Sequence, residues 1–363
     1  MTFTWRRPDG SGFVTAGVAA RIRCDDVDSI GERYGEHAVA VGALPFAGEP
    51  GLVVPARVTW FDSDGAGATH ELSDPASWID PPQRDDDFVR LPRRFVVEAV
   101  QDLAVWDGAI AAALELIDDG ALEKVVLARE VTVEADAPFV VREVLDRLTR
   151  TQPGCYVYGD DGFVGATPEL LVCRDGNAVR SRPMAGTTAR RDDPVADDTA
   201  VAALVASAKD DHEHRLVVDA VRDALAVWCD TLDIADPVAE RFTTVTHLTT
   251  TVTGHLRSDA PHALGLALAL HPTPAVGGAP RAEALEAIER LESFERGQYG
   301  GPVGWVDAHG DGEFAVALRC AAITGTRARL LAGAGIVAGS DPDLEWAETQ
   351  AKLEPMLRCL VRP

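Results

Sequence analysis

Apolar runs with the character of β-strands recur along this chain, and the helical segments between them follow no regular order. The strand-like runs lie at residues 12–14, 38–41, 51–54, 124–133, 163–183, 247–256 and 302–337. Within the run at residues 163–183, a turn is expected at residues 175–176. Within the run at residues 302–337, turns are expected at residues 310–312 and 324–326. Helical spacing predicts helices at residues 97–117, 199–229, 281–293 and 343–361. Strands that do not alternate one by one with helices indicate an α/β (α+β) protein with large antiparallel sheets.

One segment has the composition of a linker. Residues 71–95 contain Pro75, Pro81 and Pro82 together with an acidic run at residues 85–87. Prolines and clustered charges interrupt regular structure and favour a solvated loop. We therefore expect a boundary here, and the chain that follows reads as continuous to its end.

The acidic composition limits the partners that this chain can have. Its 363 residues include 58 Asp and Glu against 34 Lys and Arg, which gives a net charge of −24. Such a surface repels nucleic acid and anionic lipid, so we expect neither as a partner. No apolar run is long enough to span a membrane, and the first residues lack the apolar stretch of a signal peptide, which predicts a cytoplasmic protein. The six cysteines form no CxxC pair, so neither a zinc site nor a disulfide framework is expected.

Lysine is scarce in this chain. Of the 34 basic residues only Lys124, Lys209 and Lys352 are lysines, and the rest are arginines. Coding bias and adaptation to salt are both open as explanations. Where arginine fills nearly every basic position, a remaining lysine is more often one whose ammonium must be able to lose a proton, which a guanidinium cannot do.

Two predicted helices carry acidic residues on or beside an apolar face. Glu213 lies three and four residues before Leu216 and Val217, on the stripe that should be buried. A buried carboxylate is costly unless it is paired or binds a metal, and the alternative is a glutamate that reaches solvent at the edge of the stripe. Glu348 and Lys352 are four residues apart beside the core-facing side of the last helix. They could equally form a surface ion pair worth about 0.3–0.5 kcal/mol.

Three further charged residues lie in apolar or small-residue surroundings. Arg319 alternates with alanines along a predicted strand, which leaves room beside its guanidinium for a bound carboxylate, although a neighbouring acid could also pair with it. Lys124 opens a predicted strand, and Glu169 follows a proline in the middle of another. With the three charged residues on the helices, they make three acids and three bases. That set fits a magnesium-dependent site for a small anionic substrate.

Nine segments resemble, in the same order, motifs of the chorismate-utilising enzymes and, within that family, of the isochorismate synthases. They are residues 123–129, 165–171, 183–187, 209–214, 271–278, 299–305, 319–321, 332–337 and 345–352. The resemblance implies one domain of two large packed antiparallel sheets flanked by helices. In it, residues 1–95 would form a loosely matched, β-rich N-terminal part and residues 96–363 the chorismate-binding catalytic region.

The resemblance also implies a role for each candidate residue. Lys124 matches the general base that activates water to attack C2 of chorismate, and Glu169 the general acid that protonates the departing 4-hydroxyl. Glu213 and Glu348 match the ligands of Mg²⁺, which would hold the C1 carboxylate. The positions that match the substrate pocket are Gly186, Thr187, His271, Ala275, Arg319, Gly333 and Lys352. The implied activity is magnesium-dependent isomerisation of chorismate to isochorismate, by a monomer without a glutaminase subunit.

Small departures from the family pattern bear on the product. They are Met184 and Val276, where leucine is usual or common, and Thr167 in place of serine. The alternative within the family is a salicylate synthase, which forms isochorismate and then eliminates pyruvate. An anthranilate synthase fits less well, because those enzymes use ammonia and lack the lysine base. A binding module without catalysis would not need both Lys124 and Glu169. Menaquinone and siderophore synthesis both remain open as the pathway.

Overall fold

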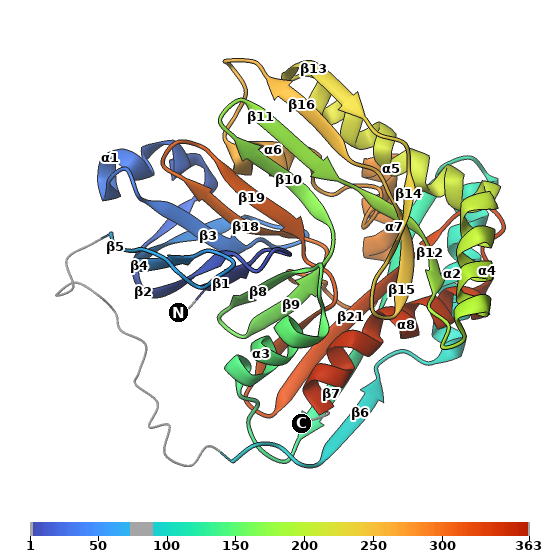
Figure 1. Cartoon of the computed structure of the whole chain (residues 1–363). Coiled ribbons are helices and arrows are strands. Elements are labelled where there is room, and N and C mark those ends of the chain that lie inside the picture. The colour runs from blue at the N-terminus through green and yellow to red at the C-terminus, as the bar shows by residue number, and fades with distance from the viewer. Residues whose placement is uncertain (1–2, 73–89, 362–363) are drawn as a thin grey trace.

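A computed structural model describes residues 3–72 and 90–361 of the chain (Figure 1). The strands of its N-terminal part are β1 (Phe3–Arg6), β2 (Gly12–Arg23), β3 (Val39–Ala43), β4 (Gly51–Phe61) and β5 (Thr69–Glu71). The later strands are β6 (Phe95–Ala99), β7 (Lys124–Ala135), β8 (Tyr156–Asp160), β9 (Phe163–Thr167), β10 (Leu170–Asp175), β11 (Ala178–Arg182), β12 (Met184–Ala189), β13 (Cys229–Ile234), β14 (Val238–Arg241), β15 (Val245–Thr249), β16 (Val252–Leu256), β17 (Gly278–Ala279), β18 (Pro302–Asp307), β19 (Gly312–Val316), β20 (Cys320–Thr324) and β21 (Arg327–Ile336). The helices are α1 (Ile30–Tyr34), preceded by a 3₁₀ turn at Cys24–Ser29, and α2 (Leu103–Asp118), α3 (Val141–Thr151), α4 (Pro194–Ala206), α5 (Ala208–Ala226), α6 (Ala263–Leu270), α7 (Arg281–Leu291) and α8 (Pro342–Val361).

Most strands belong to one continuous antiparallel network. One half runs in the order β13, β16, β11, β10, β19, β18, β3, and the other runs β4, β2, β1, β8, β9, β20, β21, β7. The halves meet where β3 pairs with β4. A separate three-stranded sheet contains β12, β15 and β14. The predicted α/β fold with large antiparallel sheets is therefore confirmed, and the N-terminal strands are hydrogen-bonded into both halves.

The two halves pack against each other through aromatic side chains. The rings of Phe13 on β2 and Trp305 on β18 meet edge to face with 5.9 Å between their centroids. The indole N–H of Trp5 on β1 donates to Oε2 of Glu313 on β19 at 3.2 Å. These contacts join strands that are about 300 residues apart in sequence, so the N-terminal part stabilises the sheet that carries the later motifs.

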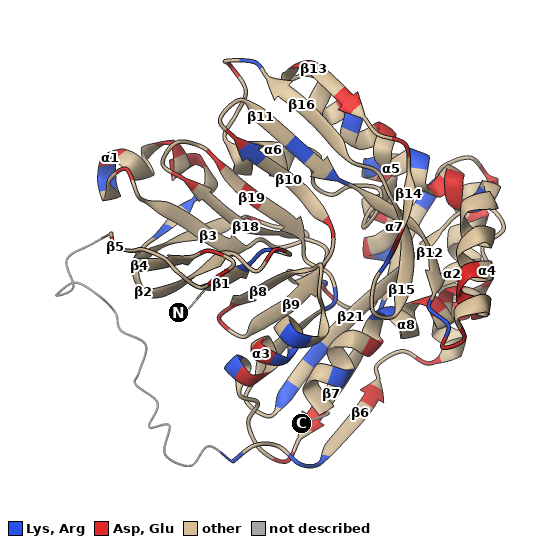
Figure 2. Ribbon diagram, in the orientation of Figure 1, with Lys and Arg blue, Asp and Glu red and all other residues tan. Residues whose placement is uncertain are grey.

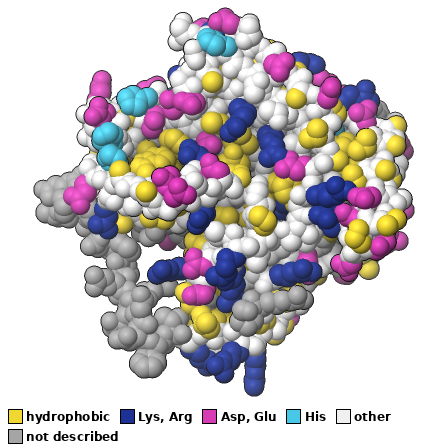
Figure 3. Space-filling view, in the orientation of Figure 1, with side chains coloured by type: hydrophobic (Ala, Val, Ile, Leu, Met, Phe, Trp, Pro, Cys, Tyr) yellow, Lys and Arg dark blue, Asp and Glu magenta, His cyan; other side chains and the backbone are white. Residues whose placement is uncertain are grey.

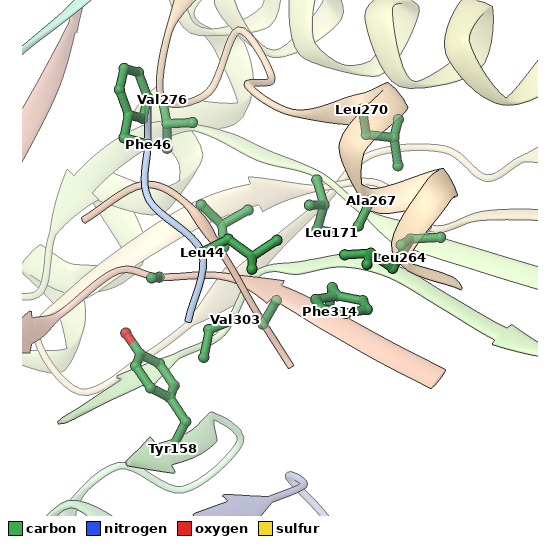
Figure 4. Packing of buried hydrophobic residues seen from close by; sticks show 14 of the residues in the cluster. Leu44, Phe46, Tyr158, Leu171, Leu264, Ala267, Leu270, Val276, Val303 and Phe314 are labelled. Carbon is green, nitrogen blue, oxygen red and sulfur yellow. The ribbon is translucent and has the colours of Figure 1, made fainter. Parts of the chain in front are cut away.

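Helix α6 covers one face of the half that contains β10 and β19. In Figure 4, Leu264 and Ala267 of α6 point toward Leu171 of β10 and Phe314 of β19. All four side chains are almost fully buried. Burial of one such leucine or phenylalanine stabilises a fold by about 1.5–3 kcal/mol, so this helix stabilises the half that contains β10 and β19.

Helices α3 and α8 enclose a second core on the other half. Leu148 of α3 and Leu353 and Met356 of α8 belong to the same buried cluster as Val133 of β7 and Val164 of β9. Figure 1 shows α8 lying along β21, so that its length follows the strand that pairs with β7. This packing determines which face of α8 is buried against β21 and α3.

Two of the helix predictions are partly wrong: one helix begins later than predicted, and the other is divided in two. The helix predicted at residues 97–117 begins only at Leu103, because residues 95–99 form β6 and the side chain of Asp102 caps the helix by accepting from the Val105 N–H at 2.9 Å. The helix predicted at residues 199–229 is two helices. The break comes at Ser207, whose backbone is extended and whose hydroxyl caps α5 by accepting from the Asp210 N–H.

The strand predicted at residues 247–256 is also wrong, since the chain leaves one sheet and enters another between β15 and β16. The strands predicted at residues 302–337 are confirmed as β18 to β21, but the meander predicted from them is wrong, because they form two hairpins, β18 with β19 and β20 with β21, in different halves of the network. The expected turns contain Gly310 and Gly325, both with positive φ, which glycine adopts without a steric penalty.

Charged residues lie mainly outside the sheets. In Figure 2 the strands β3, β8, β9 and β18 are mostly tan, while the helices carry most of the red and blue segments. Acidic and basic side chains are interspersed over the face shown in Figure 3.

Most of the predicted linker, residues 73–89, lies outside the described residues. Within the described part of the chain, no helix combines the length and the apolar character that a membrane crossing requires.

Candidate active site

One pocket collects most of the predicted site residues. Its volume is about 670 Å³, counting the space open to solvent at its mouth, and its wall comes from β7, β12, β15, β21, α5, α8 and the loops before β10, β17, β18 and β20. Seven predicted residues line it: Glu169, Thr187, Glu213, Ala275, Arg319, Gly333 and Lys352. The pocket is open because alanine and glycine, which have small side chains or none, occupy much of the inner face of β21.

Lys124 lies directly behind this wall at the start of β7. Its side chain is 1% exposed, and its Nζ is 2.9 Å from Oε1 of Glu213 on α5. Burial would raise the pKa of Glu213, but Lys124 and the two other lysines hold that pKa below its ordinary value. Gly335 on β21 makes the pair possible, because a Cβ at this position would collide with both side chains. The lysine and the carboxylate are thus locked together at the edge of the pocket.

Lys352 and Glu348 form the ion pair that their spacing on α8 predicts. Nζ of Lys352 is 2.7 Å from Oε1 of Glu348, and it also donates to the backbone carbonyl of Gly333 on β21 at 2.9 Å. Burial raises the pKa of Glu348; Lys352 opposes the shift, and the charges of Glu213 and Glu345 increase it. Carboxylates from α5 and α8 therefore lie near enough to repel each other, and a bound cation would relieve this repulsion.

Glu169 stands in a break between two strands rather than inside one strand. The predicted apolar strand ends at Thr167, turns through Pro168, and resumes at Leu170. The side chain of Glu169 is buried, and burial raises its pKa to about 8, although Lys124, Lys352 and Arg319 oppose the shift. At neutral pH the group is mostly protonated, so it can donate a proton to a molecule in the pocket.

The raised pKa of Glu169 gives a pH prediction. If Glu169 donates a proton in the rate-limiting step, the turnover rate should fall as the pH rises through about 8. Glu169→Gln keeps the shape but has no proton to give, so it should be slower by about 10²–10⁴ and should lose this alkaline limb. Measuring kcat from pH 6 to pH 10 for both proteins checks this. If kcat of the variant still falls at alkaline pH as it does in wild type, a group other than Glu169 causes that fall.

A stability measurement tests the same carboxyl independently of activity. The pKa of Glu169 is about 8 in the folded protein and near 4.5 in an unfolded chain, so folding takes up a proton between these two pH values. The carboxyl therefore lowers the free energy of unfolding progressively as the pH rises across this range. Glu169→Gln removes that contribution, and its Tm relative to wild type should rise between pH 5 and pH 8. A constant difference in Tm would contradict the raised pKa.

Arg319 is held in an unusual backbone conformation. The strand predicted to run through it is wrong: β19 ends at Val316, β20 begins at Cys320, and Arg319 between them has a φ of 48°. Such a conformation in a residue other than glycine persists only where the surroundings enforce it, as functional sites often do. Its guanidinium is buried, and the inward turn of the backbone brings it to the pocket wall.

A histidine and a threonine fix the guanidinium of Arg319. Nη2 of Arg319 is 2.9 Å from Nε2 of His247, and Nδ1 of His247 is 3.0 Å from Oγ1 of Thr187. A guanidinium can only donate, so Nε2 must accept and Nδ1 must carry the hydrogen. Burial and the charge of Arg319 keep the pKa of His247 well below its ordinary value, so the ring is neutral. Arg319 is therefore held as a fixed cation suited to a carboxylate.

The other predicted residues differ in whether they line the pocket. Gly186 has a φ of 71° on β12, and its neighbour Thr187 lines the pocket. Ala275 lines it directly. His271 does not: its Nε2 is 2.9 Å from the carbonyl oxygen of Phe46, so its ring supports the loop that carries Ala275. The substrate contact that the resemblance implied for His271 stays a prediction.

Sequence reasoning missed two parts of the site. His247 was not predicted, although a histidine in an apolar, threonine-rich strand is a recognisable signal. The pair of Lys209 with Glu345, whose Nζ and Oε1 are 2.9 Å apart, was also missed. The scarcity of lysine did point to it, because all three lysines of the chain are paired with glutamates: Lys124, Lys209 and Lys352.

Comparison with known proteins identifies the family. The sequence pattern of the family described as "Chorismate binding enzyme" matches residues 73–361, which is more than half of the chain. This protein belongs to the chorismate-binding enzymes. Among its relatives is a protein of Mycobacterium tuberculosis described as "Putative isochorismate synthase MenF", which is 43% identical over 346 residues and covers 90% of this chain and 88% of the relative.

Two other chorismate-binding enzymes extend the comparison. Isochorismate synthase DhbC of Bacillus subtilis is 38% identical over 336 residues, covering 89% of this chain and 80% of that protein. The solved structure of MenF, the menaquinone-specific isochorismate synthase from Escherichia coli, superposes with a TM-score of 0.84 at 27% sequence identity. The match covers 99% of this chorismate-binding enzyme and 88% of that structure, so the N-terminal strands are part of the shared fold.

Proposed function

We propose that this protein is an isochorismate synthase, which converts chorismate to isochorismate. One observation carries the proposal: a buried and mostly protonated glutamate, Glu169, lines one small pocket, and a buried lysine, Lys124, lies behind its wall close enough to influence the pKa of Glu169. A base and an acid in one site are what the exchange of a hydroxyl group requires. The names of the relatives from Mycobacterium tuberculosis, Bacillus subtilis and Escherichia coli support the same reaction.

The proposed reaction needs one proton removed and one proton delivered. In its neutral amine form, Lys124 accepts a proton from water as the water oxygen forms a bond to C2 of chorismate. The ring double bond moves, the bond between C4 and the hydroxyl oxygen breaks, and Glu169 protonates the departing oxygen. One water enters and one leaves, so the net change is an isomerisation. Arg319, held by His247, and Lys352 line the pocket and would bind the carboxylates of the substrate.

Glu213 and Glu348 are the residues that would hold Mg²⁺. Across residues 3–72 and 90–361, no three His, Cys, Asp or Glu side chains already form a metal-binding group. Mg²⁺ nevertheless commonly uses one or two protein carboxylates and completes its shell with water and substrate oxygens. The raised pKa of Glu348, to which the charge of Glu213 contributes, fits a position that a cation would stabilise. When bound there, Mg²⁺ would neutralise these carboxylates and attract the C1 carboxylate of chorismate.

A turnover assay tests the proposal against a binding module without catalysis. The purified protein should consume chorismate when Mg²⁺ is supplied, should stop when the metal is chelated, and should recover when Mg²⁺ is added in excess. A matched sample of Glu169→Gln separates catalysis from spontaneous decay of chorismate. If wild type and this variant consume chorismate at the same rate, the protein is not the catalyst.

A further inference from the structure

The Lys209–Glu345 ion pair joins the two helices that carry the proposed metal ligands. Lys209 lies in the first turn of α5, four residues before Glu213, so both side chains project from the same face of that helix. Glu345 lies three residues before Glu348 on α8 and shares its face in the same way. The pair therefore connects α5 and α8 about one helical turn away from each carboxylate.

Both helices pack on β12, and one side-chain bond joins them directly. α5 also packs on β13, and α8 also packs on β21 and α3. Within residues 3–72 and 90–361, the bond from Lys209 Nζ to Glu345 Oε1 is the one hydrogen bond or ion pair that joins α5 to α8. Loss of this bond would therefore remove the direct link between the helices that carry Glu213 and Glu348.

Helix energetics alone do not explain a lysine at this position. Ser207 caps α5, so Lys209 lies in the first turn, where the helix dipole disfavours a positive charge. The side chain of Glu345 is 5% exposed, and a carboxylate so buried is costly without a partner. Each residue compensates for the unfavourable position of the other, which ties the two helices together at one point.

We propose that Lys209 and Glu345 are positioning residues that hold Glu213 and Glu348 at the separation a divalent cation requires. The inference rests on the proposed function for its metal. Lys209 also places a positive charge near Glu213, while Glu345 adds a negative charge near Glu348. The bond between Lys209 and Glu345 thus opposes the repulsion between carboxylates that would otherwise push α5 and α8 apart before the cation binds.

Direct titration of Mn²⁺ without chorismate, followed by electron paramagnetic resonance, tests this inference. Lys209→Met cannot form the pair and should bind Mn²⁺ about 10-fold more weakly, as loss of a group supporting a metal ligand usually causes. Glu345→Gln should do the same, and the double variant should be little worse than either single variant, because each removes the same contact. Lys209→Arg can still pair and should remain near wild type.

The control is a second ion pair on the same helix. Arg215 and Asp211 pair on the exposed side of α5 with 2.9 Å between Nη2 and Oδ2, so Arg215→Met should leave Mn²⁺ binding unchanged. In the turnover assay, Lys209→Met should raise the Mg²⁺ concentration for half-maximal rate by about the same factor of 10, and excess Mg²⁺ should largely restore kcat.

Two results would overturn the inference. Either wild type binds no Mn²⁺, or Lys209→Met and Glu345→Gln lower Tm but bind Mn²⁺ as wild type does, which would make the pair a structural contact only. Failure of the proposed function is a separate result, since it would appear as a wild-type protein that binds Mn²⁺ but makes no isochorismate. If Lys209→Met fails to fold, the nearly isosteric Glu345→Gln decides the question.

Discussion

Lys124→Arg is expected to reduce the rate of isochorismate formation by about 10²–10⁴, nearly as much as Lys124→Ala. Arginine keeps the positive charge beside Glu213, so the buried ion pair can persist in some form. It cannot accept a proton from water at any working pH, because the guanidinium in place of the amine stays protonated. Charge is thus preserved and only the ability to act as a base is removed.

Chorismate binding separates this explanation from a change of shape. Arg319 and Lys352 are untouched by the substitution, so the affinity for chorismate should change far less than kcat. Tm of both variants shows whether the fold survives the loss of a side chain that is 1% exposed. A Lys124→Arg enzyme that kept more than about a tenth of the wild-type rate would show that Lys124 only positions substrate by its charge.

Glu213→Ala and Glu348→Ala should each abolish magnesium-dependent turnover. Each variant removes one of the two carboxylates that would hold the metal, and Lewis-acid stabilisation of several kcal/mol corresponds to a loss of more than about 100-fold. The substitutions also leave Lys124 or Lys352 without its ion-pair partner. Turnover measured over a range of Mg²⁺ concentrations distinguishes lost metal binding from a general loss of activity.

A matched control for these variants lies on α8 itself. Glu354 pairs with Arg358 four residues later in a largely exposed position, so Glu354→Ala removes a comparable ion pair away from the pocket. It should keep wild-type turnover and the wild-type response to Mg²⁺, since exposed pairs of this kind contribute little. Retention of normal activity by either Glu213→Ala or Glu348→Ala at ordinary Mg²⁺ concentration would refute the metal assignment.

The sequence predicted those parts of the site that depend on local spacing. Glu348 and Lys352 are one helical turn apart, so their ion pair followed from position alone. The rarity of lysine marked Lys124, Lys209 and Lys352, and all three are paired with glutamates. Strand alternation was similarly sufficient for the hairpins β18–β19 and β20–β21, because pairing within a hairpin is local, but it did not show that the two hairpins belong to different halves of the network.

Other parts depend on contacts that no local pattern encodes. The Lys124–Glu213 pair joins residues that are 89 positions apart, and Gly335 leaves the room for it. Arg319 was expected on a continuous strand, but its positive φ is imposed by the surroundings rather than by its own sequence preference. The contact between Nε2 of His271 and the carbonyl oxygen of Phe46 joins residues 225 positions apart, which no local pattern predicts. In each case long-range packing overrides the local pattern.

Chromatographic identification of the product formed from chorismate tests the proposed function most directly. Incubated with Mg²⁺, the wild-type protein should form isochorismate until chorismate and isochorismate reach a constant ratio, without release of pyruvate. The same ratio should be reached from pure isochorismate, because an isomerisation runs in both directions. Accumulation of salicylate together with an equal amount of pyruvate would contradict the proposal and identify a salicylate synthase, and a reaction mixture with no product would contradict catalysis altogether.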